Sequence, residues 1–222
     1  MIRKFKTNVL NTFKNWKDER FSEDLPNKLP IYNSQGDIIA FLKPITKSIL
    51  RKDGEIKLLA KWRDENSFAF ASQFKVTFGG TKKWTKGLIE NPTRILFFIE
   101  SKEKKSRLIG HIGLFTFNFR SNSCEIDNVV RGDKENLKGV MSFALKSLIN
   151  WSAKKLKPKH LYLRVLDDNK RAIDFYRRNG FKDLYKIPLK KHEKPGMVSW
   201  EEERGLKKAE KYFLKMTYIP QL

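Results

Sequence analysis

The chain has 222 residues and a mass of 26.2 kDa; 40% of its residues are hydrophobic and 13% are aromatic. These proportions allow one substantial buried core, so global disorder is excluded and a single domain, with room for an appendage, is expected. The 47 Lys and Arg residues outnumber the 25 Asp and Glu residues, for a net charge of +22, which favours anionic partners such as nucleic acid, lipid headgroups or phosphorylated small molecules, or else a basic solvated surface.

Cysteine usage and hydropathy exclude further classes of protein. The single cysteine, Cys124, excludes an intrachain disulfide framework and a cysteine-based zinc site. No apolar run reaches the ~18 residues that a membrane span requires, and no signal-peptide core follows the first methionine. We therefore expect a cytoplasmic protein, and no pattern in the sequence predicts a metal site.

The predicted elements begin with a polar segment and continue as strands and helices. Residues 1–30 contain Pro26 and Pro30 and are expected to form a loosely docked amphipathic arm, whereas residues 31–222 are expected to form one domain. The elements of this domain are, in chain order, a hairpin over 31–42, helices over 58–72 and 82–90, strands over 94–100, 108–115 and 124–130, a helix over 140–153, a strand over 160–166, a helix over 170–178, a strand from 181 and a strand over 212–219. The alternation of strands and helices predicts a mixed α/β sheet covered by helices.

Two details of these elements depend on a few residues. Thr81 is expected to cap the helix over 82–90. A charged insertion over 191–209, helix-like at Glu201 to Glu203, separates the last two strands. This insertion is expected to cover a substrate site, although a solvated loop or a contact in a homodimer would have the same composition.

A loop with two glycines lies where a predicted strand leads into an apolar helix. The strand ends at Arg131, Gly132 follows, and Gly139 directly precedes the helix over 140–153. Free amides at a helix N-terminus bind anions, glycine lets a phosphate approach them, and Arg131 and Lys138 add positive charge. The loop is neither a Walker loop nor a dinucleotide-binding fingerprint, and a plain strand-to-helix turn would look similar.

The next strand and helix carry the most specific pattern in the chain. After the strand over 160–166, the sequence matches strand-(D/E)-x-N-x-x-A-x-x-x-Y-x-x-x-G-F through Asn169, Ala172, Tyr176, Gly180 and Phe181. This pattern strongly resembles the signature of the Gcn5-related N-acetyltransferase (GNAT) family. The resemblance covers about residues 36–219 and is most specific from 125 to 181. The glycine loop departs from the family by being longer than its usual Arg/Gln-x-x-Gly-x-Gly/Ala.

The resemblance implies the GNAT fold, an α/β fold with a central mixed, mostly antiparallel sheet of about seven strands and helices on both faces. Two central parallel strands, here 124–131 and 160–166, would splay apart to admit acetyl-CoA or another acyl-CoA. Asn169 would contact this cofactor or cap the helix over 170–178. The full set of implied cofactor contacts is Asn128, Val129, Val130, Arg131, Gly132, Lys138, Gly139, Val140, Met141, Asn169, Ala172, Phe175 and Arg178.

The resemblance also implies roles in acyl transfer to an amine. Tyr176, a phenol protonated at neutral pH, would give its proton to the leaving thiolate, unless it only packs in the core. A backbone amide within 128–130 would polarise the thioester carbonyl. The base is left open among Glu125 and Asp127, which share one face of a strand, and His111 on the neighbouring strand. A carboxylate paired with an arginine, or a histidine held by a hydrogen bond, would instead be structural.

Short segments are similar to GNAT members that acylate amino groups on nucleotide-linked sugars. They are Trp62-Arg63, the segment of Thr81 and Trp84, and residues 109–113. The positive charge fits a nucleoside diphosphate, so the expected partner is a small-molecule amine, most specifically a nucleotide-linked amino sugar. The expected acceptor contacts are Trp62, Arg63, Trp84, Trp200 and Arg204, with Trp62 equally suited to the core.

Two other functions fit parts of the same sequence. Acetylation of protein N-termini or ribosomal proteins would use the same scaffold but needs an acidic groove for a peptide amine, which this basic chain supplies poorly. A non-catalytic module that binds nucleic acid would explain the net charge. The sequence carries no RRM, KH, zinc-finger or basic-zipper signature, so nucleic acid is the less expected partner.

Overall fold

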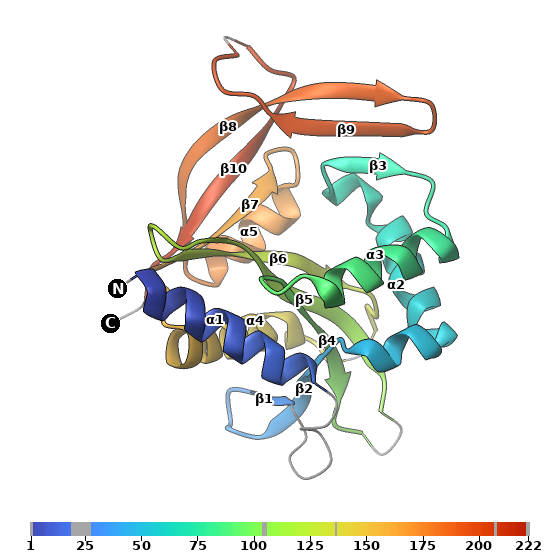
Figure 1. The fold of residues 1–222 in the computed structure, drawn as a ribbon, viewed down its shortest axis with the longest axis vertical. Helices are drawn as coiled ribbons and strands as arrows, with labels where there is room; N and C mark the ends of the chain where they lie inside the picture. The colour runs from blue at the N-terminus through green and yellow to red at the C-terminus, as the bar shows by residue number, and fades with distance from the viewer. Residues whose placement is uncertain (1, 19–27, 104–105, 136, 207, 221–222) are drawn as a thin grey trace.

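The computed structural model describes residues 2–18, 28–103, 106–135, 137–206 and 208–220 (Figure 1). The helices are α1 (Ile2–Lys17), α2 (Asp53–Glu65), α3 (Phe78–Glu90), α4 (Val140–Trp151) and α5 (Lys170–Arg178). The strands are β1 (Leu29–Tyr32), β2 (Ile38–Pro44), β3 (Ser72–Phe74), β4 (Ile95–Ser101), β5 (Leu108–Asn118), β6 (Ser123–Arg131), β7 (His160–Leu166), β8 (Phe181–Lys194), β9 (Met197–Glu202) and β10 (Lys211–Tyr218). No helix in these ranges is both long and apolar enough to cross a membrane.

The strands form one sheet in the order β1-β2-β4-β5-β6-β7-β10-β8-β9-β3. Its pairs are antiparallel except β6 with β7, which are parallel, so the predicted mixed and mostly antiparallel sheet is confirmed. The sheet has ten strands rather than about seven, partly because β9 and β3 extend it beyond β8 (Figure 1). The predicted helix-like character of Glu201 to Glu203 is wrong, because β9 pairs with β8 from Met197 to Glu202 and this pairing overrides the helix propensity of glutamate.

The central parallel strands pair over a short distance and then separate. Their ladder joins Ser123 with His160, Cys124 with Leu161 and Glu125 with Tyr162, and ends there, although both strands continue. The predicted splayed pair is therefore confirmed. An opening forms between the carboxyl-terminal halves of β6 and β7.

A β-bulge lies in the part of β6 that borders this opening. His111 of β5 pairs with Val130 and Gly113 pairs with Asp127, so two residues of β6, Asn128 and Val129, lie opposite one residue of β5. Asn128 has φ +53°, a left-handed conformation that asparagine adopts more readily than most residues. Such a bulge bends the strand and removes residues from the regular ladder.

Helices cover both faces of the sheet, and β4 shows how the core divides. Alternate side chains of this fully buried strand point to opposite faces. Ile95, Phe97 and Ile99 belong to the core beneath α1 and α4, whereas Leu96 and Phe98 belong to the core beneath α2 and α3. In Figure 1, α1 lies beside α4, and α2 and α3 lie together on the other side of the sheet.

The prediction of a loosely docked arm is wrong for the residues of α1. Phe5, Val9 and Phe13 are at most 5% exposed and belong to the main core, and the ring centroid of Trp16 lies 5.1 Å from that of Trp151. These apolar residues recur every four positions, which places them on one helix face. Residues 19–27, including Pro26, lie outside the described residues.

The predicted cap of α3 is also wrong. The side chain of Thr77, rather than Thr81, caps this helix, because its Oγ1 accepts a hydrogen bond of 3.1 Å from the backbone amide of Gly80. Thr81 lies one turn inside the helix, where it is 8% exposed. The helix therefore begins at Phe78, about one turn earlier than predicted.

Candidate active site

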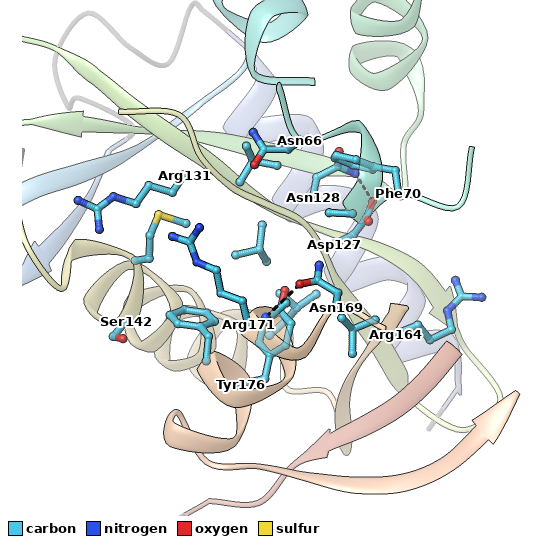
Figure 2. Close-up of a pocket in the computed structure, with 18 of the residues that line it drawn as sticks. Asn66, Phe70, Asp127, Asn128, Arg131, Ser142, Arg164, Asn169, Arg171 and Tyr176 are labelled. Carbon is cyan, nitrogen blue, oxygen red and sulfur yellow. Dashed lines mark hydrogen bonds between the residues drawn. The ribbon is translucent and has the colours of Figure 1, made fainter. Parts of the chain in front are cut away.

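The opening between β6 and β7 is a cavity of about 360 Å³, bounded also by the start of α4 and by α5 (Figure 2). Asp127 and Asn128 lie on its β6 side, and Asn169 and Tyr176 lie across from them on the side of α5. The residues expected to contact a cofactor that do line this cavity are Asn128, Val129, Val130, Arg131, Gly139, Met141, Asn169, Ala172, Phe175 and Arg178. The loop before α4 and the motif on α5, which are separate in the sequence, thus line the same cavity.

Three residues expected to contact the cofactor lie elsewhere. Gly132 packs against the indole of Trp62, where an added Cβ would lie 1.9 Å from Trp62 Cε2, so this glycine serves close packing. The Lys138 side chain is exposed and lies outside the cavity lining. Val140 is fully buried in the main core, and its amide donates to the Leu137 carbonyl over 3.1 Å.

The cavity has the features that an anionic cofactor requires. Arg131, Lys134, Arg171 and Arg178 contribute positive side chains to its lining, and Figure 2 shows Arg131 and Arg171 reaching toward the same end. Gly139 has φ +83° at the start of α4, and no side chain caps that helix. The Val140 amide donates to the Leu137 carbonyl and the Ser142 amide to the Gly139 carbonyl. The amides of Gly139 and Met141 have no backbone partner among the described residues, so these two can meet a phosphate at the start of α4. The residues present fit the phosphates of an acyl-CoA.

Lys134, Ser142 and Arg171 line this cavity but were not predicted. Lys134 and Lys138 belong to the same basic loop, from which the sequence predicted a contact for Lys138. The sequence of a loop does not show which of its lysines faces the cavity. Arg171 directly precedes the motif residue Ala172, so its place at the first turn of α5 was available in the sequence.

The sequence left two roles open for Tyr176, a proton donor in the site or a residue packed in the core, and its position in the structure is compatible with both. It is 9% exposed and packs against Phe175 and Phe181, yet it also lines the cavity. Burial raises the pKa of the Tyr176 phenol well above its usual value, and the charges of Asp127 and Glu125 raise it further. The phenol is therefore protonated throughout the neutral range and available as a donor.

Asn169 likewise fits both of its predicted roles. Its Oδ1 accepts a hydrogen bond of 3.2 Å from the Ala172 amide and caps α5. The same side chain lines the cavity between β6 and β7. The cap fixes the asparagine in place, so a ligand in the cavity meets a pre-oriented amide.

A second cavity, of about 550 Å³, adjoins the first on the side of α2 and α3. Five residues line both cavities and mark their junction: Ala69, Phe70, Asp127, Asn128 and Arg164. Such a pair of connected cavities suits a reaction between two substrates that enter from different sides and meet at the shared residues.

Of the three candidate bases, Glu125 is fully occupied by an ion pair. Arg164 Nε lies 2.8 Å from its Oε1 and Arg164 Nη2 lies 2.7 Å from its Oε2. Arg164 also pairs with Glu202 of β9. Burial raises the pKa of Glu125, and the hydrogen bonds from Arg164 oppose that effect. Glu125 is a structural member of a buried pair that joins β6 to β7.

His111 is buried and neutral. It is 3% exposed, and burial lowers its pKa to about 4. Its Nδ1 lies 2.8 Å from the backbone carbonyl of Asn128, and because a carbonyl only accepts, Nδ1 carries the proton. The ring therefore holds the β-bulge.

Asp127 remains as the carboxylate with access to both cavities. Its side chain is 31% exposed. Arg94 Nη2 lies 3.1 Å from its Oδ2, and the Asn128 side-chain amide donates to the same oxygen. Arg94 also lines the second cavity and was not predicted, because a lone arginine at the start of a strand carries no sequence signal.

Some of the residues expected to contact the acceptor line the second cavity, and the others do not. Arg63 and Trp84 line this cavity. Trp62 does not, because it is 3% exposed and packs against Phe98 and His111. Trp200 is 8% exposed in a small core with Leu166 and Leu189, and Arg204 is exposed in a turn after β9; neither lines either cavity.

The comparisons with known proteins agree with this geometry. The family model for the acetyltransferase (GNAT) family matches residues 58–181. Acetyltransferase PseH of Campylobacter jejuni subsp. jejuni serotype O:23/36 (strain 81-176) is 29% identical over 146 residues, which are 63% of this chain and 88% of that protein.

Solved structures show the same fold at low sequence identity. RimL, a ribosomal L7/L12 alpha-N-protein acetyltransferase, gives a TM-score of 0.63 at 14% identity over 87% of this chain and 94% of RimL. A spermidine N-acetyltransferase SpeG chimera from Vibrio cholerae and hSSAT gives 0.54 at 17% identity over 75% and 90%. A probable GNAT acetyltransferase from Chromobacterium violaceum ATCC 12472 gives 0.62 at 14% identity over 86% of each chain. At these identities the likeness shows the fold alone.

Proposed function

This chain belongs to the acetyltransferase (GNAT) family, and we propose that the amine it acylates is the amino group of a nucleotide-linked sugar. The chain is an enzyme of the acetyltransferase type, which uses acetyl-CoA or another acyl-CoA. The observation that carries the proposal is the junction of two cavities at Asp127 and Asn128, one with phosphate-binding features and the other with arginines and aromatic rings.

The first cavity accounts for binding of the acyl donor. An acyl-CoA supplies an activated acyl group as a thioester. Its phosphates are held by the backbone amides of Gly139 and Met141 at the start of α4 and by the side chains of Arg131, Lys134, Arg171 and Arg178. The bulge in β6 releases backbone from the ladder beside the opening, and an amide within 128–130 polarises the thioester carbonyl.

Two side chains move the protons. Asp127 accepts the proton of the acceptor ammonium, directly or through one water, so that the nitrogen can attack. Tyr176 donates its phenol hydrogen to the departing sulfur, which its high pKa allows by keeping the phenol protonated at neutral pH. Glu125 and His111 support the site rather than the proton transfer, because one is paired with Arg164 and the other is neutral and bonded to Asn128.

The lining of the second cavity favours an acceptor that carries a diphosphate. The Arg63 guanidinium lies 3.8 Å from the ring centroid of Phe70 and 5.1 Å from that of Phe74. Its Nη2 donates to the Ser72 carbonyl, but its buried Nη1 has no hydrogen-bond partner among the described residues. Buried donors are normally satisfied, and an anionic oxygen of the acceptor would satisfy this one. A polyamine would instead meet a like charge at Arg63, which forms no ion pair with a carboxylate among the described residues.

Calorimetry followed by an activity assay tests the proposal. Acetyl-CoA and then CoA are titrated into the purified protein, and a uridine-diphosphate-linked amino sugar is titrated into the CoA complex. We expect binding at each step and release of free thiol when acetyl-CoA and the sugar are mixed. Arg63→Met should weaken sugar binding and leave CoA binding unchanged, whereas Arg120→Met, in an exposed turn, serves as the matched control. CoA binding without sugar binding, together with acetylation of a peptide N-terminus, would overturn the proposed acceptor.

A further inference from the structure

The two oxygens of the Asp127 carboxylate have different surroundings. Oδ2 accepts from Arg94 Nη2 at 3.1 Å and from the side-chain amide of Asn128. Oδ1 has no hydrogen-bond partner within the part of the chain that the structure describes. Figure 2 shows Asp127 and Asn128 joined beside Phe70, where the two cavities meet. One oxygen is thus fixed by two donors, and the other is without a donor on a residue that lines both cavities.

Arg94 is itself held rigidly. Its side chain is 17% exposed. Its guanidinium lies 4.5 Å from the ring centroid of Phe115 on β5 and 5.4 Å from that of Trp84 on α3. Two aromatic contacts of this kind hold the planar cation in one orientation, so its donors are aimed before any ligand binds.

Asn128 is fixed from the opposite side. His111 Nδ1 donates to its backbone carbonyl over 2.8 Å, inside the β-bulge where Asn128 has φ +53°. Because Nδ1 faces a carbonyl, it carries a hydrogen in the neutral ring as well as in a protonated one, so this donor does not depend on pH. A continuous series of hydrogen bonds therefore runs from His111 through Asn128 to Asp127, and Arg94 completes it from β4.

We propose that Arg94 is a positioning residue for the acyl transfer, which anchors Asp127 through Oδ2 so that Oδ1 alone receives the proton of the acceptor amine. This inference rests on the proposed function of the same site. The transfer itself is balanced: the N–H bond of the ammonium breaks, an O–H bond forms at Oδ1, and the electron pair stays on the nitrogen that attacks the acyl carbon.

The charge of Arg94 also acts on Asp127. The charged and titratable groups around this carboxylate are Arg94 before β4, His111 on β5, Glu125 on β6, Arg164 on β7 and Tyr176 on α5. Arg164 is committed to Glu125 and Glu202, and His111 and Tyr176 are neutral. Arg94 is therefore the cation that the structure places in contact with Asp127, and its removal would leave Oδ2 with the Asn128 side-chain amide as its one donor among the described residues.

The first test needs no acceptor. The carboxyl ¹³C resonance of Asp127 is assigned by its absence in Asp127→Asn and is recorded at pH 7 in each variant. We expect this resonance to shift and broaden in Arg94→Met, because Asp127 loses the hydrogen bond that fixes Oδ2 and can take more than one orientation, and to stay near its original position in Arg94→Lys. Arg120→Met, which removes one cation from an exposed turn, should not move it. An unmoved and unbroadened resonance in Arg94→Met overturns the inference even if the acceptor has been misidentified.

The second test uses turnover of acetyl-CoA with a uridine-diphosphate-linked amino sugar. Arg94→Met should lower kcat about 10- to 100-fold at neutral pH, with the KM for acetyl-CoA and the KM for the sugar each within about twofold. In Arg94→Ala, added guanidinium should recover part of the rate by entering the space between Trp84 and Phe115.

Specific outcomes contradict the role of Arg94. A raised KM for the sugar with an unchanged kcat would mean that Arg94 binds the acceptor and does not position Asp127. A loss of rate that neither added guanidinium nor Arg94→Lys restores would mean that Arg94 only supports the fold. Absence of turnover in the unsubstituted protein would contradict the proposed acceptor instead, and the ¹³C resonance of Asp127 would still decide the inference.

Discussion

Replacing Gly132 by alanine separates a packing role from a phosphate-binding role. The added Cβ would lie 1.9 Å from Trp62 Cε2 and 2.0 Å from Trp62 Nε1, far closer than carbon atoms approach without a shift. Trp62 is 3% exposed and touches both Phe98 and His111, so the indole has no free space to enter. Overpacking of this kind costs about 3 kcal/mol, which for a chain of this size lowers Tm by roughly 6–12 °C.

Gly139→Ala is the matched comparison. Gly139 has φ +83°, and an added Cβ would meet only Phe143, at 3.6 Å. The left-handed backbone costs an alanine about 1 kcal/mol, so the expected loss of Tm is only about 2–4 °C. Gly139 lines the first cavity and Gly132 does not. In Gly139→Ala, the loss of binding free energy for CoA should therefore exceed the loss of unfolding free energy.

Thermal unfolding and calorimetry with CoA, on both variants, distinguish these roles. Gly132→Ala should be the less stable protein, and its folded fraction, measured well below Tm, should bind CoA within about twofold of the unsubstituted affinity. If instead Gly132→Ala unfolds normally and fails to bind CoA, Gly132 approaches a phosphate, and the packing of Gly132 against Trp62 is not the reason for this glycine.

Two further predictions concern the proton-carrying groups. Tyr176→Phe should lower kcat about 100-fold or more while the affinity for acetyl-CoA stays nearly constant, because only the donor hydroxyl is removed. Steady-state kinetics measure kcat and calorimetry measures the affinity. An unchanged kcat would mean that Tyr176 is not the acid. His111 has a pKa of about 4 in the folded protein against 6.5 for an unperturbed histidine, so the unfolded chain binds more protons between these values and stability falls as pH falls through this window. Urea unfolding should show that lowering the pH from 7 to 5 costs about 2 kcal/mol more in the unsubstituted protein than in His111→Gln; an equal loss in both would place the titration on another group.

The parts of the fold that sequence reasoning obtained correctly are those with local causes. The bounds of β7 and α5 were predicted to the residue, because Asn169 caps the helix and Gly180, at φ +88°, ends it. The splayed parallel pair came from the family resemblance, not from any local pattern. The firm packing of α1 was missed although Phe5, Val9 and Phe13 recur at a helical interval, since the polar composition of residues 1–30 and the prolines at 26 and 30 suggested a loosely docked amphipathic arm.

The parts that sequence reasoning missed depend on which residues meet across the sheet. Trp62, Trp84 and Trp200 carry similar signals in the sequence, yet of these three only Trp84 lines the second cavity, and the other two are buried in the core. Arg94 and Asp127 are 33 positions apart and meet because β4 and β6 both flank β5. Similarly, a glycine beside a phosphate loop has the same appearance in sequence as one that packs against an indole. Contacts of this kind are fixed by tertiary structure and leave no local pattern.

The opening between β6 and β7 and the orientation of Asp127 have a common structural origin. The Glu125–Arg164 pair joins the two strands near the last rung of their ladder, and the bulge begins within a few residues of it, so β6 turns away from β7 directly beyond a firm junction. The same bulge puts Asn128 in a left-handed conformation, which lets one residue give its carbonyl to His111 and its side-chain amide to Asp127. Glu125, Arg164, His111 and Asn128 therefore fix the backbone at the opening, and we expect their substitution to change CoA binding and the orientation of Asp127 together.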